Sequence, residues 1–171
     1  MRLDRAIILS FFLPIAAYGQ TNNSQHAAAL LLKSDQLTLH TALQLTDLAR
    51  TKAAALNKEV AIAILDSGGQ IIMVSRGDGV GFHNTEAARR KAFTAVSTKT
   101  TTLTLSRNAR SNPDTENLAS LPELLLLGGG VPIYHKGKVI GAIGVAGGGS
   151  PENDDLIGKS AGILTADIIA K

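Results

Sequence analysis

Two pairs of short apolar segments, each pair joined by a tight turn, constrain the fold of this chain more than any other feature. Segments 60–65 and 70–75 flank the turn sequence Asp66-Ser67-Gly68-Gly69, and segments 131–134 and 139–146 flank a second turn. Strands joined by so short a connection run antiparallel, whereas parallel strands need a crossover of about a dozen residues or more. The pattern therefore predicts two β-hairpins in an antiparallel sheet, not a doubly wound parallel sheet.

Apolar residues at helical spacing surround these hairpins. They predict a first helix over 38–57, with Thr38 as its N-cap, and a second over 84–99, with Asn84 as its N-cap. The apolar stripe of the first helix is predicted to hold Leu39, Ala42, Leu45, Ala49 and Leu56, widened by Leu43 and Leu48. The apolar side of the second helix is narrow and made of small residues, which should let this helix pack closely on the sheet: Ala88, Ala92 and Ala95.

The remaining segments complete an α+β pattern. A short helix is predicted over 102–110, and residues 124–127 are predicted to form a short buried strand or to lead into one. Ser150 can cap a last helix. Its apolar stripe is predicted to hold four residues: Ile157, Ala161, Leu164 and Ile168. The order helix, hairpin, helix, short helix, hairpin, helix indicates an antiparallel sheet flanked by helices.

The amino-terminal residues have the three-part layout of a secretory signal. Arg2 and Arg5 precede the apolar run 6–17, and small residues precede Gln20. The run is shorter than the roughly 20 apolar residues that a spanning helix needs. We therefore expect residues 1–19 to be cleaved, residues 20–36 to form a tether and residues 37–171 to form one domain. The mature protein would then be periplasmic or secreted and have no membrane span.

Composition excludes several classes of function. The chain has no cysteine, which rules out thiolate metal sites and thiol chemistry. Loss of the signal would remove two of 17 basic and one of 14 acidic residues, leaving a net charge near +2. This charge is too small to indicate a nucleic-acid partner, and no basic stripe with interleaved aromatic residues is present.

The segment 76–86 gathers side chains of several chemical types. Arg76, a carboxylate, an aromatic ring and His83 all occur within it. One interpretation is a pocket rim that includes His83, with Arg90 or Lys91 reaching an anionic ligand. The other is a capped helix that carries a solvated Glu86–Arg90 pair. A single imidazole is enough to hold a haem iron, because the porphyrin supplies the other four equatorial ligands.

Glycine clusters stand at two predicted strand ends. Gly128, Gly129 and Gly130 precede one strand, and residues 147–149 follow another. Such clusters can form tight turns alone, or a backbone-lined pocket approached closely by a ligand. Glu152 and Asp154 follow the second cluster, so a carboxylate-rimmed pocket is the second interpretation. These acidic residues would repel phosphate, and no phosphate-binding motif is present.

Four stretches share their order and spacing with a known family: VAIAILDSGGQIIMVSRGDG, HNTEAARRKAFTA, LLLLGGGVPI and GKVIGAIGVAGGGSPENDD. From about Leu37 to Ile169 the chain resembles the GlcG/HbpS family of haem-binding proteins, which includes the C-terminal domain of PduO-type proteins. The resemblance implies a five-stranded antiparallel sheet with helices on both faces, a profilin-like α-β-α sandwich, and a homo-oligomer. It also implies haem as a cofactor, with haem degradation attributed to some secreted members.

Residues 81–84 depart from the family pattern, which often has an acidic or serine-containing stretch at this place. His83 is therefore a candidate iron ligand on chemical grounds and not by a matched ligand position. Arg76, Arg90 or Lys91 would then face the haem propionates.

Two other functions stay open. One is a small-metabolite enzyme or sensor that uses the backbone of 128–130, with Lys91 and either Glu152 or Asp154 as charged groups. No nucleophile motif is present, so no catalytic residue is named. The other is an assembly module whose glycine turns pack subunits together.

Overall fold

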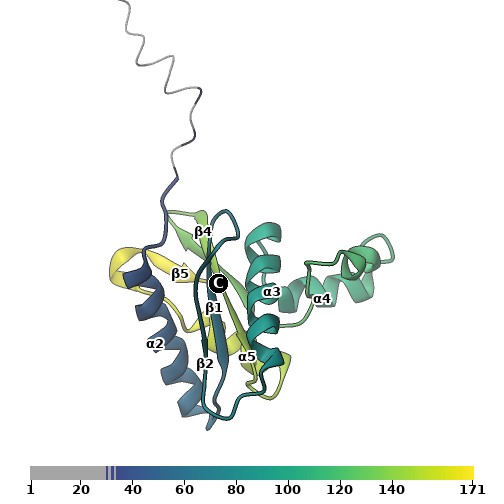
Figure 1. Cartoon of the computed structure of the whole chain (residues 1–171). Coiled ribbons are helices and arrows are strands. Elements are labelled where there is room, and N and C mark those ends of the chain that lie inside the picture. Colours follow the sequence, from purple (N-terminus) through teal and green to yellow (C-terminus); the bar gives the residue numbers. More distant parts are fainter. Residues whose placement is uncertain (1–29, 31, 33) are drawn as a thin grey trace, which may run out of the picture. The chain divides into compact units, whose positions relative to one another are not determined.

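A five-stranded antiparallel sheet with helices on both faces forms the centre of the computed structural model (Figure 1). The strand order is β2-β1-β4-β3-β5, and every neighbouring pair is antiparallel. The predicted α+β fold and both predicted hairpins, β1–β2 and β3–β4, are confirmed. The strands have these bounds: β1 (Ala61–Asp66), β2 (Ile71–Arg76), β3 (Gly130–His135), β4 (Lys138–Ala146) and β5 (Ile168–Ala170).

The structure describes Leu30, Leu32 and residues 34–171. The predicted signal at 1–19 and most of the predicted tether lie outside these residues. Ser34–Lys171 forms one compact unit. No helix within the described part is long and apolar enough to cross a membrane. The helices and short 3-10 turns have these bounds: α2 (Leu39–Ala55), α3 (His83–Thr98), α4 (Thr102–Ser111), η1 (Glu116–Ser120), α5 (Pro151–Lys159) and η2 (Leu164–Ala166).

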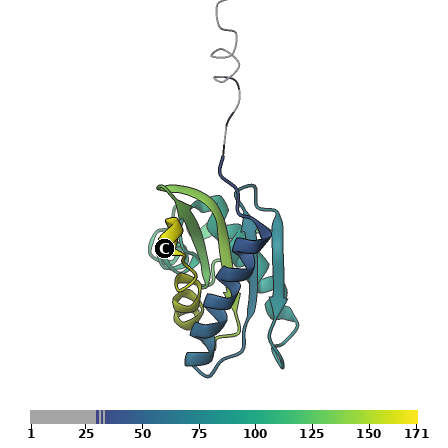
Figure 2. The ribbon, with the colours of Figure 1, turned by 90° about the vertical axis from the view of Figure 1, so that its left-hand side faces the viewer.

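Strand β1 lies inside the sheet and is buried on both faces. Its side chains alternate: Ile62 and Ile64 pack toward α2 and α5, whereas Ala61 and Ala63 pack toward α3. Figure 2 shows α2 and α5 side by side on one face of the sheet, and α2 and α5 are in contact. Ile62 and Ile64 therefore fill the space under two helices, and Ala61 and Ala63 leave room for a closer third helix.

Helix α3 packs against the sheet without large side chains between them. Ala88, Ala92 and Ala95 are fully buried, which confirms the predicted narrow face of small residues. A Cβ atom at Gly144 of β4 would collide with the carbonyl oxygen of Ala88, and one at Gly130 of β3 would collide with that of Lys91. Glycine is required at both strand positions because the helix backbone lies directly on them.

The first helix begins where the sequence predicts. The Thr38 hydroxyl accepts a hydrogen bond from the Thr41 N–H at 3.1 Å, so the predicted N-cap is confirmed. The predicted burial of Leu39, Leu43 and Leu48 is wrong, since all three side chains are exposed. The predicted burial of Ala42, Leu45 and Ala49 is confirmed, and Thr46 and Ala53 complete the buried face of α2.

The carboxyl-terminal region differs from the prediction of one long helix. Helix α5 ends at Lys159, and the chain turns through η2 and Asp167, which has a positive φ of 51°. Ile168 then begins β5, which pairs with β3 and forms an edge of the sheet. The open edge of β3 offers backbone hydrogen bonds to this β-branched segment, and these outweigh its helical spacing. Residues 124–127 do not form a strand but are irregular and lead into β3, which begins at Gly130, and β5 is the fifth strand.

Candidate functional site

The amino-terminal half of α3 and the connection between β4 and α5 enclose a pocket of about 270 Å³, called here the α3–α5 pocket. His83, Ala87 and Lys91 line it from α3, where their spacing of four residues places them along one helix face. The other lining residues come from α3 itself, the segment before β3, the end of β4 and the start of α5: Asn84, Leu127, Ala146, Gly147, Gly149, Ser150, Pro151 and Asp154.

A buried ion pair forms part of this pocket. Lys91 Nζ donates to Asp154 Oδ2 at 2.7 Å and to the carbonyl oxygen of Val145 at 2.9 Å. The two side chains are 1% and 8% exposed. Asp154 Oδ1 accepts from the N–H of Gly148 at 2.7 Å. The pair therefore ties α3 to α5 and fixes the glycine turn after β4.

Burial perturbs both members of the pair. It lowers the pKa of Lys91, and the attraction of Asp154 opposes this change. It also raises the pKa of Asp154, which Lys91 and the backbone N–H groups of the glycine turn oppose. Desolvation is the larger effect for each group, as is common for ion pairs removed from water.

The walls of the α3–α5 pocket are mainly apolar. They include Ala87, Leu127, Ala146 and Pro151. The His83 imidazole is exposed, and no hydrogen bond joins it to any other group in the described part of the chain. Its ring lies against Gly81, where a Cβ atom would be 2.9 Å from the imidazole. The pocket thus combines apolar walls with one imidazole that is free to bind a ligand.

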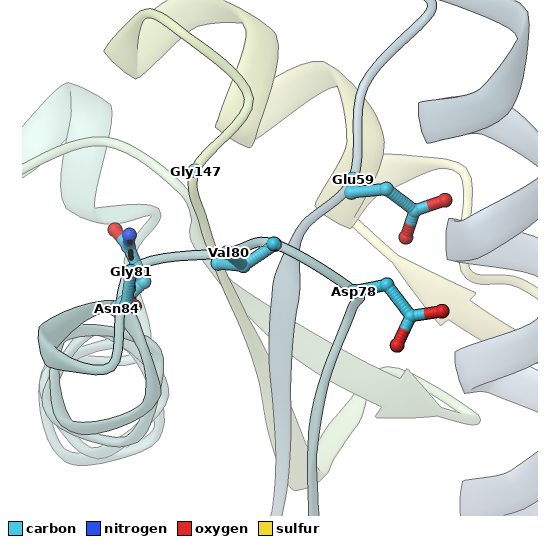
Figure 3. A pocket seen from close by; sticks show the side chains of 7 residues that line it. Glu59, Asp78, Val80, Gly81, Asn84 and Gly147 are labelled. Atoms are coloured by element: carbon cyan, nitrogen blue, oxygen red, sulfur yellow. Dashed lines mark hydrogen bonds between the residues drawn. The ribbon is translucent and has the colours of Figure 1, made fainter.

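A second pocket of about 290 Å³ adjoins the first, since both are lined by Asn84 and Gly147 (Figure 3). Glu59 and Asp78 bring two carboxylates to it. Figure 3 shows both carboxylates on the side of Val80 away from Asn84. Both carboxylates lie beyond the shared wall, where Glu59 pairs with Arg50 at 3.7 Å, and Asp78 adds negative charge that disfavours an anionic group at that end.

The structure brings together three of the side chains singled out from the sequence: His83, Lys91 and Asp154. Gly129 lies directly over the ion pair, because a Cβ atom there would be 2.7 Å from the Asp154 Cβ and 3.2 Å from Lys91 Nζ. A Cβ atom at Gly128 would be 2.6 Å from the carbonyl oxygen of Pro151.

In the glycine cluster 128–130, the backbone is hydrogen-bonded to another part of the protein. The N–H of Gly130 donates to Thr102 Oγ1 at 2.8 Å, and the same hydroxyl donates to the carbonyl oxygen of Leu127 at 2.8 Å. Both interpretations of the cluster were open at the level of sequence. In this structure, residues 128–130 serve close packing around the ion pair.

Three other predicted site residues lie outside the α3–α5 pocket. Arg76 is exposed at the end of β2. Arg90 Nη2 donates to the carbonyl oxygens of Pro122 and Leu124, at 2.7 and 2.8 Å. Glu152 pairs with Arg107 at 3.0 Å in a solvent-exposed position.

Helix α3 also differs from the sequence prediction at its start. It begins at His83, and the Asn84 side chain does not cap it but donates to the carbonyl oxygen of Gly81 at 3.2 Å. The expected Glu86–Arg90 pair is wrong. Glu86 pairs with Arg89 at 2.7 Å, because Arg90 turns toward the free carbonyl groups of the loop before β3.

Sequence reasoning missed Lys58 and Leu127. A Cβ atom at Gly149 would lie 3.4 Å from Lys58 Nζ, so this exposed cation stands beside a residue that lines the pocket. Leu127 lines the pocket directly. No pattern in the sequence around either residue indicated a binding site, because both reach the site only through contacts between distant segments.

The chain is similar to a known protein family and to several solved structures. A family model described as "Haem degrading protein HbpS-like" matches residues 37–162. A double mutant of HbpS from Streptomyces reticuli is similar in structure, with a TM-score of 0.71 and 32% sequence identity over 89% of this chain and 96% of that one. The structure of a PduOC:haem complex has a TM-score of 0.70 and 31% identity over 78% of this chain and 97% of that one.

A similar relative by sequence is the corrinoid adenosyltransferase PduO of Salmonella typhimurium. It is 30% identical over 122 residues, which are 70% of this chain but 36% of PduO. The chain therefore spans about a third of the length of this relative.

Proposed function

Because this chain belongs to the HbpS-like family, we propose that it binds haem at the α3–α5 pocket through the imidazole of His83. The proposal rests on one observation: the His83 imidazole makes no hydrogen bond within the described residues and lies at a pocket with apolar walls. Haem iron needs only one protein ligand to be held, and an apolar surface suits the porphyrin. The similar PduOC structure, a haem complex, supports the same cofactor.

The residues of the pocket fit an edge of the porphyrin better than the whole of it. Pockets that enclose a ligand usually measure roughly 300–1,000 Å³. At about 270 Å³, the α3–α5 pocket lies just below this range. The walls Ala87, Leu127, Ala146 and Pro151 would hold the edge that enters, and the remainder of the macrocycle would cover the pocket mouth.

Charge favours one placement of the propionates. Arg90 and Lys91, considered for this role from the sequence, already have other partners. Asp78 would repel propionates from the neighbouring pocket. Lys58 is the exposed cation beside Gly149, so we assign the propionate contact to its ammonium group.

When bound, haem would supply a redox-active iron. The described residues would orient the macrocycle, and the apolar walls would keep water from one of its edges. We further propose that the chain acts after export, in the periplasm or outside the cell, and that it captures haem as a homo-oligomer. Turnover would be a separate property, and hemin titrated with and without a reductant would separate binding from degradation.

The test is a hemin titration of the mature chain followed by Soret absorption. We expect His83→Ala to shift the Soret band and to weaken binding at least tenfold, which is about 1.4 kcal/mol. His40→Ala is the matched control, because His40 is an exposed histidine in the first turn of α2. Identical spectra and affinities for the native chain and His83→Ala would refute the assignment of the iron ligand.

A second candidate function is supported by the buried ion pair. A pocket of about 270 Å³ with Lys91, Asp154 and His83 on its surface could hold a small metabolite entirely. A thermal-shift screen distinguishes the two functions. A metabolite that raises the melting temperature more than hemin does would favour this second function over haem binding.

A further inference from the structure

An exposed aromatic side chain stands next to the candidate iron ligand. Phe82 is 81% exposed and directly precedes α3, with its ring centroid 6.3 Å from that of His83. Single exposed apolar residues are common on protein surfaces and need no explanation alone. This one, however, adjoins an imidazole that makes no hydrogen bond within the described residues, at a pocket with apolar walls.

The two rings have a relative orientation that suits a shared flat ligand. Their planes meet at 81°. An imidazole that binds haem iron contains the iron–nitrogen bond in its own plane, and this bond is perpendicular to the porphyrin. The porphyrin plane is therefore perpendicular to the imidazole plane. A neighbouring ring can stack parallel to the porphyrin only if it too is nearly perpendicular to the imidazole, and Phe82 meets this condition.

The small size of the pocket would leave part of a bound porphyrin face uncovered, where Phe82 could contact it. Because about 270 Å³ admits only an edge of the macrocycle, part of the porphyrin face must lie outside the pocket. The residue next to His83 on its amino-terminal side is Phe82, and its side chain is free of the core. Aromatic rings gain from offset stacking in addition to the area that they bury.

We propose that Phe82 is a positioning residue that stacks on the porphyrin face and determines the selectivity of the site for flat tetrapyrroles. This inference rests on the proposed haem function, and it adds a recognition element that does not involve the metal. Phe82 should therefore act on porphyrins with and without iron, whereas His83 should act only on those with iron.

The experiment compares hemin with metal-free protoporphyrin IX on the full mature chain. We expect Phe82→Ala to weaken binding of both ligands about three- to tenfold, or about 0.7 to 1.4 kcal/mol, with the Soret position of bound hemin unchanged. Phe82→Trp should restore both affinities. His83→Ala should weaken hemin alone. Leu164→Ala is the control, because Leu164 is 79% exposed and lies outside the pocket.

We expect Phe82→Ala and Phe82→Trp to fold like the native chain, because the Phe82 side chain is exposed. Equal protoporphyrin IX affinities for the native chain and Phe82→Ala would overturn the inference while leaving iron ligation by His83 intact. A change in oligomer size without a change in porphyrin affinity would also overturn it, and would assign Phe82 to a contact between copies. Failure of the native chain to bind hemin would instead refute the proposed function on which the inference depends.

Discussion

Removing one member of the Lys91–Asp154 pair should destabilise the domain strongly, whereas removing both should not. In Asp154→Asn, the amide group would face Lys91 Nζ, which keeps its buried position and the carbonyl oxygen of Val145 but loses its counter-charge. Breaking a buried ion pair in this way costs about 3–5 kcal/mol. A domain of this size has a stability of about 5–15 kcal/mol, so the variant should fold with a reduced margin.

The magnitude follows from the burial of the pair. Both side chains are less than a tenth exposed, so water cannot replace the lost partner. For each group, desolvation shifts the pKa more than the attraction does. Replacing the pair with apolar residues of similar volume, Lys91→Met with Asp154→Leu, should therefore recover most of the lost stability. The double substitution also removes the hydrogen bond to the Gly148 N–H, so the recovery should be incomplete.

The assay is urea unfolding followed by circular dichroism for Asp154→Asn, Lys91→Met, Asp154→Leu and the double variant Lys91→Met with Asp154→Leu. Glu152→Gln is the matched control, because Glu152 lies in the same helix and pairs with Arg107 in an exposed position. We expect no measurable change for this control. If Asp154→Asn were as mild as Glu152→Gln, the pair would not contribute to stability as argued.

Three further predictions concern the same region. Burial lowers the pKa of Lys91 in the folded state from 10.5, and Asp154→Asn should lower it further by removing the counter-charge. The free energy of unfolding of this variant should therefore increase more steeply than that of the native chain as pH rises toward 10.5. An equal dependence of the free energy of unfolding on pH in the two chains would contradict this. Gly144→Ala should cost about 1–3 kcal/mol, because the added methyl group meets the Ala88 carbonyl; an unchanged urea midpoint would show that α3 is not packed so closely. Thr102→Val should cost about 1–3 kcal/mol by leaving the Gly130 N–H without its partner, and Thr51→Val, with an exposed hydroxyl on α2, is the control that should stay near the native midpoint.

The parts of the fold that depend on local patterns could be predicted from the sequence. The turn at 66–69 between two apolar runs was enough to predict the β1–β2 hairpin, and Thr38 marked the start of α2. The small residues of α3 indicated close packing, although the glycines that permit it lie in β3 and β4. Helical spacing failed after Lys159, because a short β-branched segment pairs with whichever strand edge is open.

The site was harder to predict because its members come from distant segments. Lys91 follows Arg89 and Arg90 in sequence, and the sequence indicated only that it could contact an anionic ligand. Only the partner 63 residues away, Asp154, explains its burial. Lys91 is four residues from Ala87 and three from Ala88, so its position on the buried helix face was the available signal. The three adjacent basic residues 89–91 carry the same charge, so their charge alone cannot show which side chain points into the protein.

The most direct test of the account is the identity of the iron ligand in the hemin-bound chain. Electron paramagnetic resonance with ¹⁵N-labelled histidine reports whether a protein imidazole nitrogen is bound to ferric iron. If His83 holds the iron, this nitrogen coupling should be present in the native chain and in His40→Ala and lost in His83→Ala. The same nitrogen coupling in native and His83→Ala chains would contradict the account, because the iron would then be held elsewhere than at the α3–α5 pocket.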